Sequence, residues 1–305
     1  MKLDGSLDYL ASDEAQESIR QDPYWPKWNS PWWHMTLLWE LGEAARIPER
    51  AVDGIVEALN MHYLHLFPIR ETEMPPDKDP YRHVACHCAL GTMYRVLAAR
   101  GVDVDGRIPH LRPWFLRYQL TDGGLNCDEA VYTKDKPHSS IVSTLPPLEA
   151  ILFDTDRSRT PEEDAFLDRG AAYLLKRKLF RSVSGGGKII DESWLEPCFP
   201  RFYHYDVLRG LRFVTAWADK REKPLPRESV KEAIDAVESA LGRADAGINR
   251  KPWREEGTLY PDGIGNWIKK KRAEPFELLE GIRAAAPLRR EWAEVKKQLR
   301  SCAAI

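Results

Sequence analysis

The stretch Trp114–Glu129, with the sequence WFLRYQLTDGGLNCDE, joins the end of a short helix to a sharp turn. Leu111, just before this stretch, and Phe115 and Gln119 within it follow one another at intervals of four residues, so they share one face of a helix. Asp122-Gly123-Gly124 then predicts a turn, because Asp and Gly are turn-forming residues. The turn could serve only to stack one helical unit on the next. The pattern of helix, turn and further helix extends from here in both directions.

Four further segments are predicted to be amphipathic helices with one face in water, because their apolar residues recur at helical spacing. The second of them begins with a capping box, in which Thr160 and Glu163 bond each other's backbone and Pro161 fits the first turn. Gly242 can end the third. The four segments are Ala51–Leu59, the helix opened by Thr160, Arg227–Leu241 and Leu288–Leu299.

Helices of a second kind alternate with these. Most carry apolar or small residues around most of their circumference, which is typical of a buried helix. Signals for strands are almost absent, so the sequence predicts an all-α protein. The five inner helices are expected over Trp32–Ala45, Val84–Arg100, about Ser140–Phe153, Tyr205–Asp219 and Pro275–Ala285.

Loop lengths also alternate, with short links after inner helices and long links before them. This places the long loops at one end, where function usually resides. His34, His87, His138 and His204 each lie near the start of an inner helix, at separations of 53, 51 and 66 residues. Such an interval indicates a helical repeat closed into a ring. We therefore expect these imidazoles to meet at the mouth of a central cavity.

The turn motif resembles the Gln-Trp repeat of squalene and hopene cyclases, and protein prenyltransferase β subunits have a related pattern. Two other stretches resemble the same superfamily, His138–Ala150 and Phe199–Arg209 (FPRFYHYDVLR). The whole chain looks like the small bacterial squalene-cyclase-like proteins. The resemblance implies a single domain over residues 1–305, an α/α toroid of about five to six helical hairpins around a central cavity. It also implies a small-molecule substrate of isoprenoid-like character.

The chain departs from these families in its catalytic motifs. Leu125 replaces the usual Trp, and Asp-x-Asp-Asp and Asp-Asp-x-x-Asp are missing. The nearest matches, Asp103–Gly106 and Asp154–Asp156, lie in short links at the other end. The zinc pattern of prenyltransferase β subunits is not matched either. We therefore carry no catalytic residue over, and cyclisation started by protonating an alkene is not expected.

The run His83–Cys88 (HVACHC) predicts a metal site, with zinc the favoured ion because His and Cys thiolate suit zinc-type ions. Cys86 and Cys88 would point some 200° apart on a helix, so both cannot face the cavity. The other interpretation is that small Cys residues permit close helix packing. The candidate metal ligands are His87, His83, Cys88 and Cys127.

Acid–base chemistry is predicted from groups in the long loops. A carboxylate with an imidazole is a workable acid–base pair, although Asp128 and its neighbour Glu129 could equally be solvated. Asp206 could simply cap a helix. The candidate catalytic residues are His138, His204, Tyr205 and Asp128.

Substrate binding is assigned to Arg209, Arg181, Trp33 and His34. Arg209 lies in the second turn of a mostly apolar helix and needs a buried carboxylate or an acidic ligand. Arg181 precedes Gly185-Gly186-Gly187, either an anion cradle or a flexible lid. Trp33 belongs to a group of N-terminal tryptophans that either faces a cation or packs the core.

Composition excludes several classes of function. The formal charge of the 305-residue chain is −2, which gives no global reason to bind nucleic acid or anionic lipid. There is no signal-peptide pattern, no apolar run long enough to span a membrane, and an odd number of cysteines, five. We therefore expect a cytoplasmic protein that does not insert into membranes, of undetermined oligomeric state.

Three functions are compatible with the sequence. The first is an enzyme, a transferase, isomerase or lyase of squalene-cyclase-like fold, that uses acid–base or metal-assisted chemistry on a small, partly apolar substrate. The second is a non-catalytic toroid that binds a hydrophobic ligand or a partner chain. The third is a zinc-dependent toroid of the lanthionine-cyclase type, suggested by Cys86-His87-Cys88.

Overall fold

A computed structural model describes most of the chain, and helices dominate it. Among the described residues, no helix combines the length and the apolar character needed to cross a bilayer. The described residues are 3–61, 86–128, 131–132, 134–242, 250–253, 257–262, 264, 266–282 and 285–301.

The predicted alternation of helices is confirmed. Four inner helices are largely buried along their length: α3 (Pro31–Glu40), α6 (His87–Ala99), α9 (Ile141–Phe153) and α11 (Val207–Lys220). Helices with one exposed face come between them: α4 (Glu49–Met61), the short α7 (Val104–Arg107) and α8 (Leu111–Arg117), α10 (Pro161–Lys176) and α12 (Arg227–Leu241). The capping box of Thr160 and Glu163 is present, and Gly242 ends α12.

Two predicted inner helices are shorter than expected. The first ends at Glu40 and is followed by a separate 3-10 turn, Ala44–Arg46. The segment expected over Pro275–Ala285 contains only the single turn α13 (Glu277–Glu280). The last helix, α14 (Ala286–Ser301), packs on α11 and α12.

Some elements were missed by the sequence analysis. Helices α1 (Leu3–Ala11) and α2 (Asp13–Gln21) precede the tryptophan-rich segment, with Ser12 capping α2. Strands β1 (Thr258–Pro261) and β2 (Trp267–Lys270) form an antiparallel hairpin in which Thr258 pairs with Lys270. The basic run Lys269–Arg272 lies on and after β2 and is exposed.

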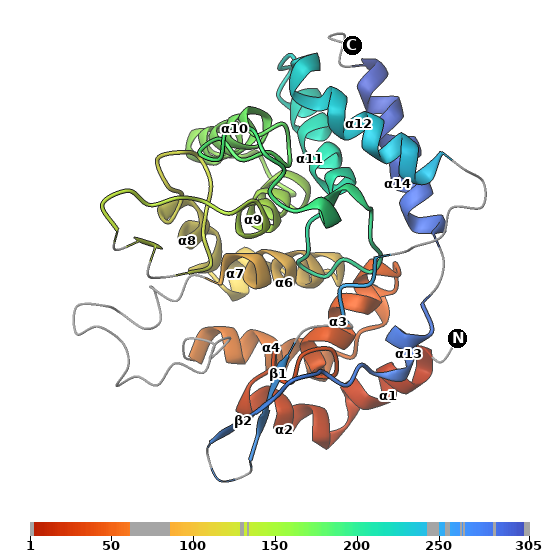
Figure 1. Cartoon of the computed structure of the whole chain (residues 1–305). Helices are drawn as coiled ribbons and strands as arrows, with labels where there is room; N and C mark the ends of the chain where they lie inside the picture. The colour runs from red at the N-terminus through yellow and green to blue at the C-terminus, as the bar shows by residue number, and fades with distance from the viewer. Residues whose placement is uncertain are drawn as a thin grey trace.

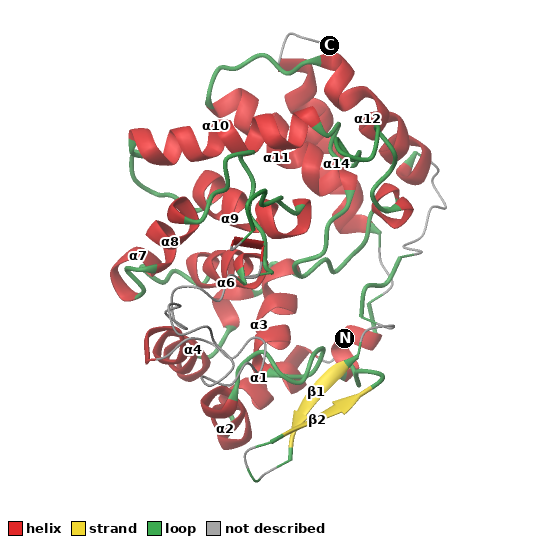
Figure 2. Cartoon of the chain, turned by 60° about the vertical axis from the view of Figure 1, so that its left-hand side comes forward, coloured by secondary structure: helices red, strands yellow, loops and turns green. Residues whose placement is uncertain are grey.

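The inner helices pack in chain order, α3 on α6, α6 on α9 and α9 on α11, and α11 also packs on α14 (Figures 1 and 2). The tightest of these contacts joins α6 to α9. A Cβ atom on Gly91 would lie 2.5 Å from the backbone of Pro146 and Pro147, so only glycine permits this approach. The arrangement is all-α apart from the hairpin, and closure of the succession into a toroid stays a prediction.

The turn that carries the family resemblance fastens helices together. The Gln119 amide donates to the carbonyls of Gly123 and Phe166, and its oxygen accepts a hydrogen bond from Arg169. Gly123 has φ +95°, and a Cβ there would lie 2.3 Å from the Arg169 carbonyl oxygen. The turn therefore ties the end of α8 to α10, in agreement with the stacking interpretation.

Replacing Gly91 with Ala should destabilise the protein by about 1–3 kcal/mol, because α6 and α9 must separate to accept the methyl group. Gly5→Ala is the matched control, since Gly5 lies on the exposed face of α1 with no atom near its Cβ position. That substitution should be neutral or stabilising by up to about 1 kcal/mol. Urea unfolding measures both. Equal effects at the two positions would contradict the close approach of α6 to α9.

Candidate functional site

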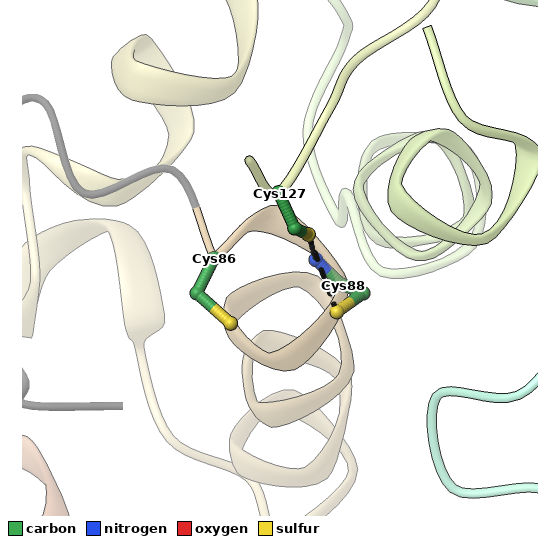
Figure 3. A group of neighbouring side chains, drawn as sticks. All are labelled: Cys86, Cys88 and Cys127. Atoms are coloured by element: carbon green, nitrogen blue, oxygen red, sulfur yellow. Dashed lines mark hydrogen bonds between the residues drawn. The ribbon is translucent and has the colours of Figure 1, made fainter. Parts of the chain in front are cut away.

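Three cysteines converge at the N-terminus of α6. Cys86 and Cys88 flank its first residue, and Cys127 comes from the loop that follows the Gly123-Gly124 turn. All three sulfur atoms lie within 4.8 Å of one another, so the group could hold a metal ion (Figure 3). The Sγ atoms of Cys88 and Cys127 are 3.3 Å apart, much longer than the roughly 2.05 Å of a disulfide.

Hydrogen bonds from the backbone position Cys127 over the helix. Its sulfur accepts a hydrogen bond from the N–H of Cys88, one of the N-terminal donors that a helix leaves without an internal partner. Its own N–H donates to the Ser143 hydroxyl on α9. The loop is held further by Asn126, whose side-chain amide donates to the carbonyl of His138. The third sulfur is thus placed by contacts to both inner helices.

Cys86 and Cys88 do not point apart as their spacing predicted. The estimate of 200° assumed that both residues are helical, but Cys86 is the N-cap of α6, with φ −80° and ψ 60°. A cap residue leaves the helical path, so its side chain turns to the same side as that of Cys88. Cys86 therefore joins Cys88 and Cys127 as a candidate ligand.

The three thiols do not ionise equally. Burial alone would raise the pKa of Cys127, but hydrogen bonding with Cys86 and Cys88 and the nearby His87 bring it well below its ordinary value. The same contacts raise the pKa of the Cys86 thiol, and hydrogen bonding with Cys127 raises that of Cys88. Cys127 is therefore the first of the three to become a thiolate, the form that binds metals.

The candidate ligand His87 lies beside the thiols in an aromatic cage. Its ring is surrounded by Trp114, Phe115, Tyr118 and Tyr132, and its Nε2 is 3.2 Å from the Tyr132 hydroxyl. Burial lowers its pKa to about 4, which keeps the imidazole neutral at pH 7. Within the described chain its Nδ1 has no hydrogen-bond partner. The other histidine predicted as a ligand, His83, lies outside the described residues.

The other predicted histidines are held in different surroundings. His34 is buried and stacks on Phe276, with ring centroids 3.7 Å apart. His204 stacks on Tyr203 at 4.4 Å. His138 is exposed. The described ring contacts of His34, His87 and His204 are with other aromatic residues, and the meeting of the imidazoles at one cavity mouth stays a prediction.

Of the other predicted catalytic residues, Tyr205 is buried in the core and Asp128 is exposed. The buried hydroxyl of Tyr205 donates to the carbonyl of Leu179 at 2.8 Å, and burial raises its pKa, so it serves as a fixed donor in the core. Asp128 is exposed, and its N–H donates to the side chain of Asn126. The neighbouring Glu129 lies outside the described residues. Asp206 caps α11, as its position at the start of the predicted helix indicated.

Two of the predicted substrate-binding residues are engaged within the protein. The Trp33 indole donates to the carbonyl of Tyr24 at 2.8 Å and packs against Trp28, which supports the core interpretation. Arg181 forms hydrogen bonds with Glu232 and with the carbonyl of Gly187. Its charge is therefore already compensated at the glycine-rich loop.

Arg209 has the buried carboxylate that its position required. Its guanidinium bonds Glu149 on α9 at 2.6 Å and donates to the carbonyls of Phe202 and His204. Arg95 on α6 approaches Oε2 of the same carboxylate at 3.3 Å. Burial alone would raise the pKa of Glu149, but Arg209 and then Arg95 lower it to about 2. A lone acid in the apolar helix IVSTLPPLEAILF was the signal that could have identified this partner.

Comparison of the chain with models of protein families, with curated proteins and with solved structures finds no match.

Glu149→Gln should destabilise the protein by about 3–5 kcal/mol at pH 7, because Arg95 and Arg209 would lose the charge between them. Glu162→Gln is the control, since Glu162 is exposed on α10 and should change stability by no more than about 0.5 kcal/mol. Denaturant unfolding measures both. A loss at position 149 no larger than at position 162 would contradict the buried ion network.

Acid should remove the advantage of the wild type over Glu149→Gln. The pKa of Glu149 is lowered in the folded state, from an ordinary value of 4.5 to about 2. Its contribution is therefore complete above about pH 4.5 and is lost as pH falls toward 2. Stability measured at several pH values should show the two proteins converging over this window. If the difference in unfolding free energy between the two proteins stayed constant with pH, protonation of Glu149 would not be coupled to folding.

Proposed function

We propose that the protein is a zinc enzyme whose metal is bound by Cys86, Cys88 and Cys127 and acts on a small, partly apolar substrate. The observation that carries the proposal is the convergence of three sulfur atoms within 4.8 Å from two separate segments of the chain. Three thiols this close together do not stabilise one another, because their negatively charged thiolate forms repel. A cation would compensate that charge and bind all three.

The donor set favours zinc. Thiolates are soft ligands that select zinc-type ions over magnesium or calcium. Zn–S bonds of about 2.3 Å place tetrahedral sulfurs about 3.8 Å apart, close to the present spacing. Three protein ligands leave a fourth position, the arrangement of catalytic zinc sites, and zinc bound in this way polarises a substrate oxygen or lowers the pKa of a bound water.

The surroundings of the thiols suit a partly apolar substrate. The ammonium group of Lys27 favours ionisation of Cys88 and lies over the rings of Trp28 and Tyr203, whose hydroxyl it bonds at 2.9 Å. On the other side, Tyr132 bonds His87. Aromatic faces with a few polar atoms are typical of small-molecule sites. These residues would orient a substrate beside the metal.

The toroid and the isoprenoid-like substrate remain part of this proposal, supported by the resemblance of the turn motif. The missing Asp-x-Asp-Asp motif favours metal-assisted chemistry over protonation of an alkene. Of the alternatives raised by the sequence, the thiol cluster favours the zinc-dependent toroid over a non-catalytic one. The four described cysteines are unpaired, which supports a reducing compartment and thus a cytoplasmic location.

Protein purified without a polyhistidine tag should contain about one zinc ion per chain, and Cys127→Ser should lose most of it, because two thiolates hold zinc poorly. Cys198→Ser is the control, since Cys198 is a buried cysteine outside the cluster and should leave the zinc content unchanged. Elemental analysis measures the metal. Replacement with cobalt should add thiolate-to-metal charge-transfer absorption that Cys127→Ser lacks. If Cys127→Ser and Cys198→Ser contained equal amounts of zinc, Cys127 would not be a zinc ligand and the proposed site would be wrong.

Removing the zinc with a chelator distinguishes a catalytic ion from a structural one. A three-ligand site at a preformed helix end should leave the helical circular dichroism intact, because the α6–α9 contact does not involve the metal. Unfolding on chelation would assign the ion a structural role and contradict the enzymatic part of the proposal.

A further inference from the structure

A cavity of about 770 Å³ lies between α3, α6, α9, α11 and α14. Its volume falls within the range of sites for small organic ligands. Aromatic rings form part of its wall, and charged groups form most of the rest. The aromatic residues are Trp39, Phe153, Phe199 and Phe202; the charged residues are Arg95, Arg201, Arg209, Arg212, Arg290, Glu40, Glu149, Glu291 and Glu294.

Most of the deep arginines are neutralised by the protein itself. Each of three guanidiniums contacts at least one carboxylate at 2.6–2.8 Å. The pairs are Arg95 with Asp154, Arg201 with Asp206 and Glu291, and Arg209 with Glu149. These charges hold the walls together and are not available to a ligand without breaking an ion pair.

Arg212 differs from these three. It lies one turn after Arg209 on α11, and its guanidinium carbon is 4.7 Å from the centre of the Phe153 ring. In the described part of the chain its guanidinium makes no hydrogen bond and no ion pair. Burial and then repulsion from Arg95 lower its pKa. Arg212 is half-buried and lines the cavity, so its guanidinium can bind an acceptor that enters there.

We propose that this cavity binds an organic monocarboxylate, with the carboxylate on Arg212 and the apolar body against the aromatic part of the wall. The planar guanidinium fork matches a carboxylate, which can accept two parallel hydrogen bonds. Glu291 and Glu294 line the same cavity and would repel the second charge of a phosphate. The site is independent of the proposed zinc centre, since Arg95 lies about 10 Å along α6 from Cys88.

Calorimetric titration with phenylacetate and hexanoate tests the proposal on the full chain. Both acids should bind with one site per chain, and phenylacetamide, which lacks the charge, should bind at least about tenfold more weakly. Arg212→Met keeps the apolar stem and should weaken carboxylate binding by about tenfold or more. Arg300→Met is the matched control, since Arg300 is exposed on α14 outside the cavity, and it should bind as the wild type does.

Three results would overturn the inference. They are no binding of either acid by the wild type up to about 10 mM, equal binding by Arg212→Met, or tighter binding of inorganic phosphate than of the acids. Arg212→Lys guards against a folding defect, because it retains the charge and loses the fork. It should bind with an affinity between those of wild type and Arg212→Met, and wild-type affinity in this variant would refute the two-bond contact. Zinc content, measured on the same samples, reports on the metal site independently, so failure of one proposal can be distinguished from failure of the other.

Discussion

The buried carboxylate of Glu149 is the interaction on which the arrangement of the inner helices depends. It is fully buried, and the guanidiniums of Arg95 and Arg209 reach it from α6 and α11. Arg209 also bonds the carbonyls of Phe202 and His204, so the same centre fixes the loop that leads into α11. A buried charge without its partners is strongly unfavourable, so these helices cannot slide independently. Glu149, Arg95 and Arg209 also line the cavity between these helices.

At the N-terminus of α6, where the thiols lie, hydrogen bonds to backbone groups determine the arrangement. The turn at Gly123 is fixed to α10 by Gln119, and the loop after it is fixed to α9 by the N–H of Cys127. That loop then delivers a sulfur atom to a free N–H at the helix start. The motif that resembles the cyclase repeat therefore ties α8 to α10 and positions Cys127, one of the proposed metal ligands.

Periodicity and capping predicted the helices because both are local properties: the Thr160 box and the apolar spacing of α12 need no knowledge of distant residues. The need of Arg209 for a partner was also local, but the identity of Glu149, 60 residues away, depends on packing. The helical-wheel exclusion of Cys86 failed because a cap residue is not helical. The histidines were grouped by repeat register alone, and register does not determine which way a ring turns. The hairpin was missed because its second strand, WIKK, lacks the apolar alternation of a half-buried strand.

The two proposed sites lie toward opposite ends of α6, and this separation constrains any shared chemistry. Cys88 and Arg95 are seven residues apart, or about 10 Å along the axis. A short carboxylic acid on Arg212 cannot also contact the thiols, whereas an acid with a long apolar chain has the length to approach both. The side chains of α6 between them are buried, including Leu90 and Met93, so such a chain would have to displace core contacts to pass. The two proposals therefore assign separate functions to the ends of α6, with metal chemistry at one end and recognition of an anion at the other.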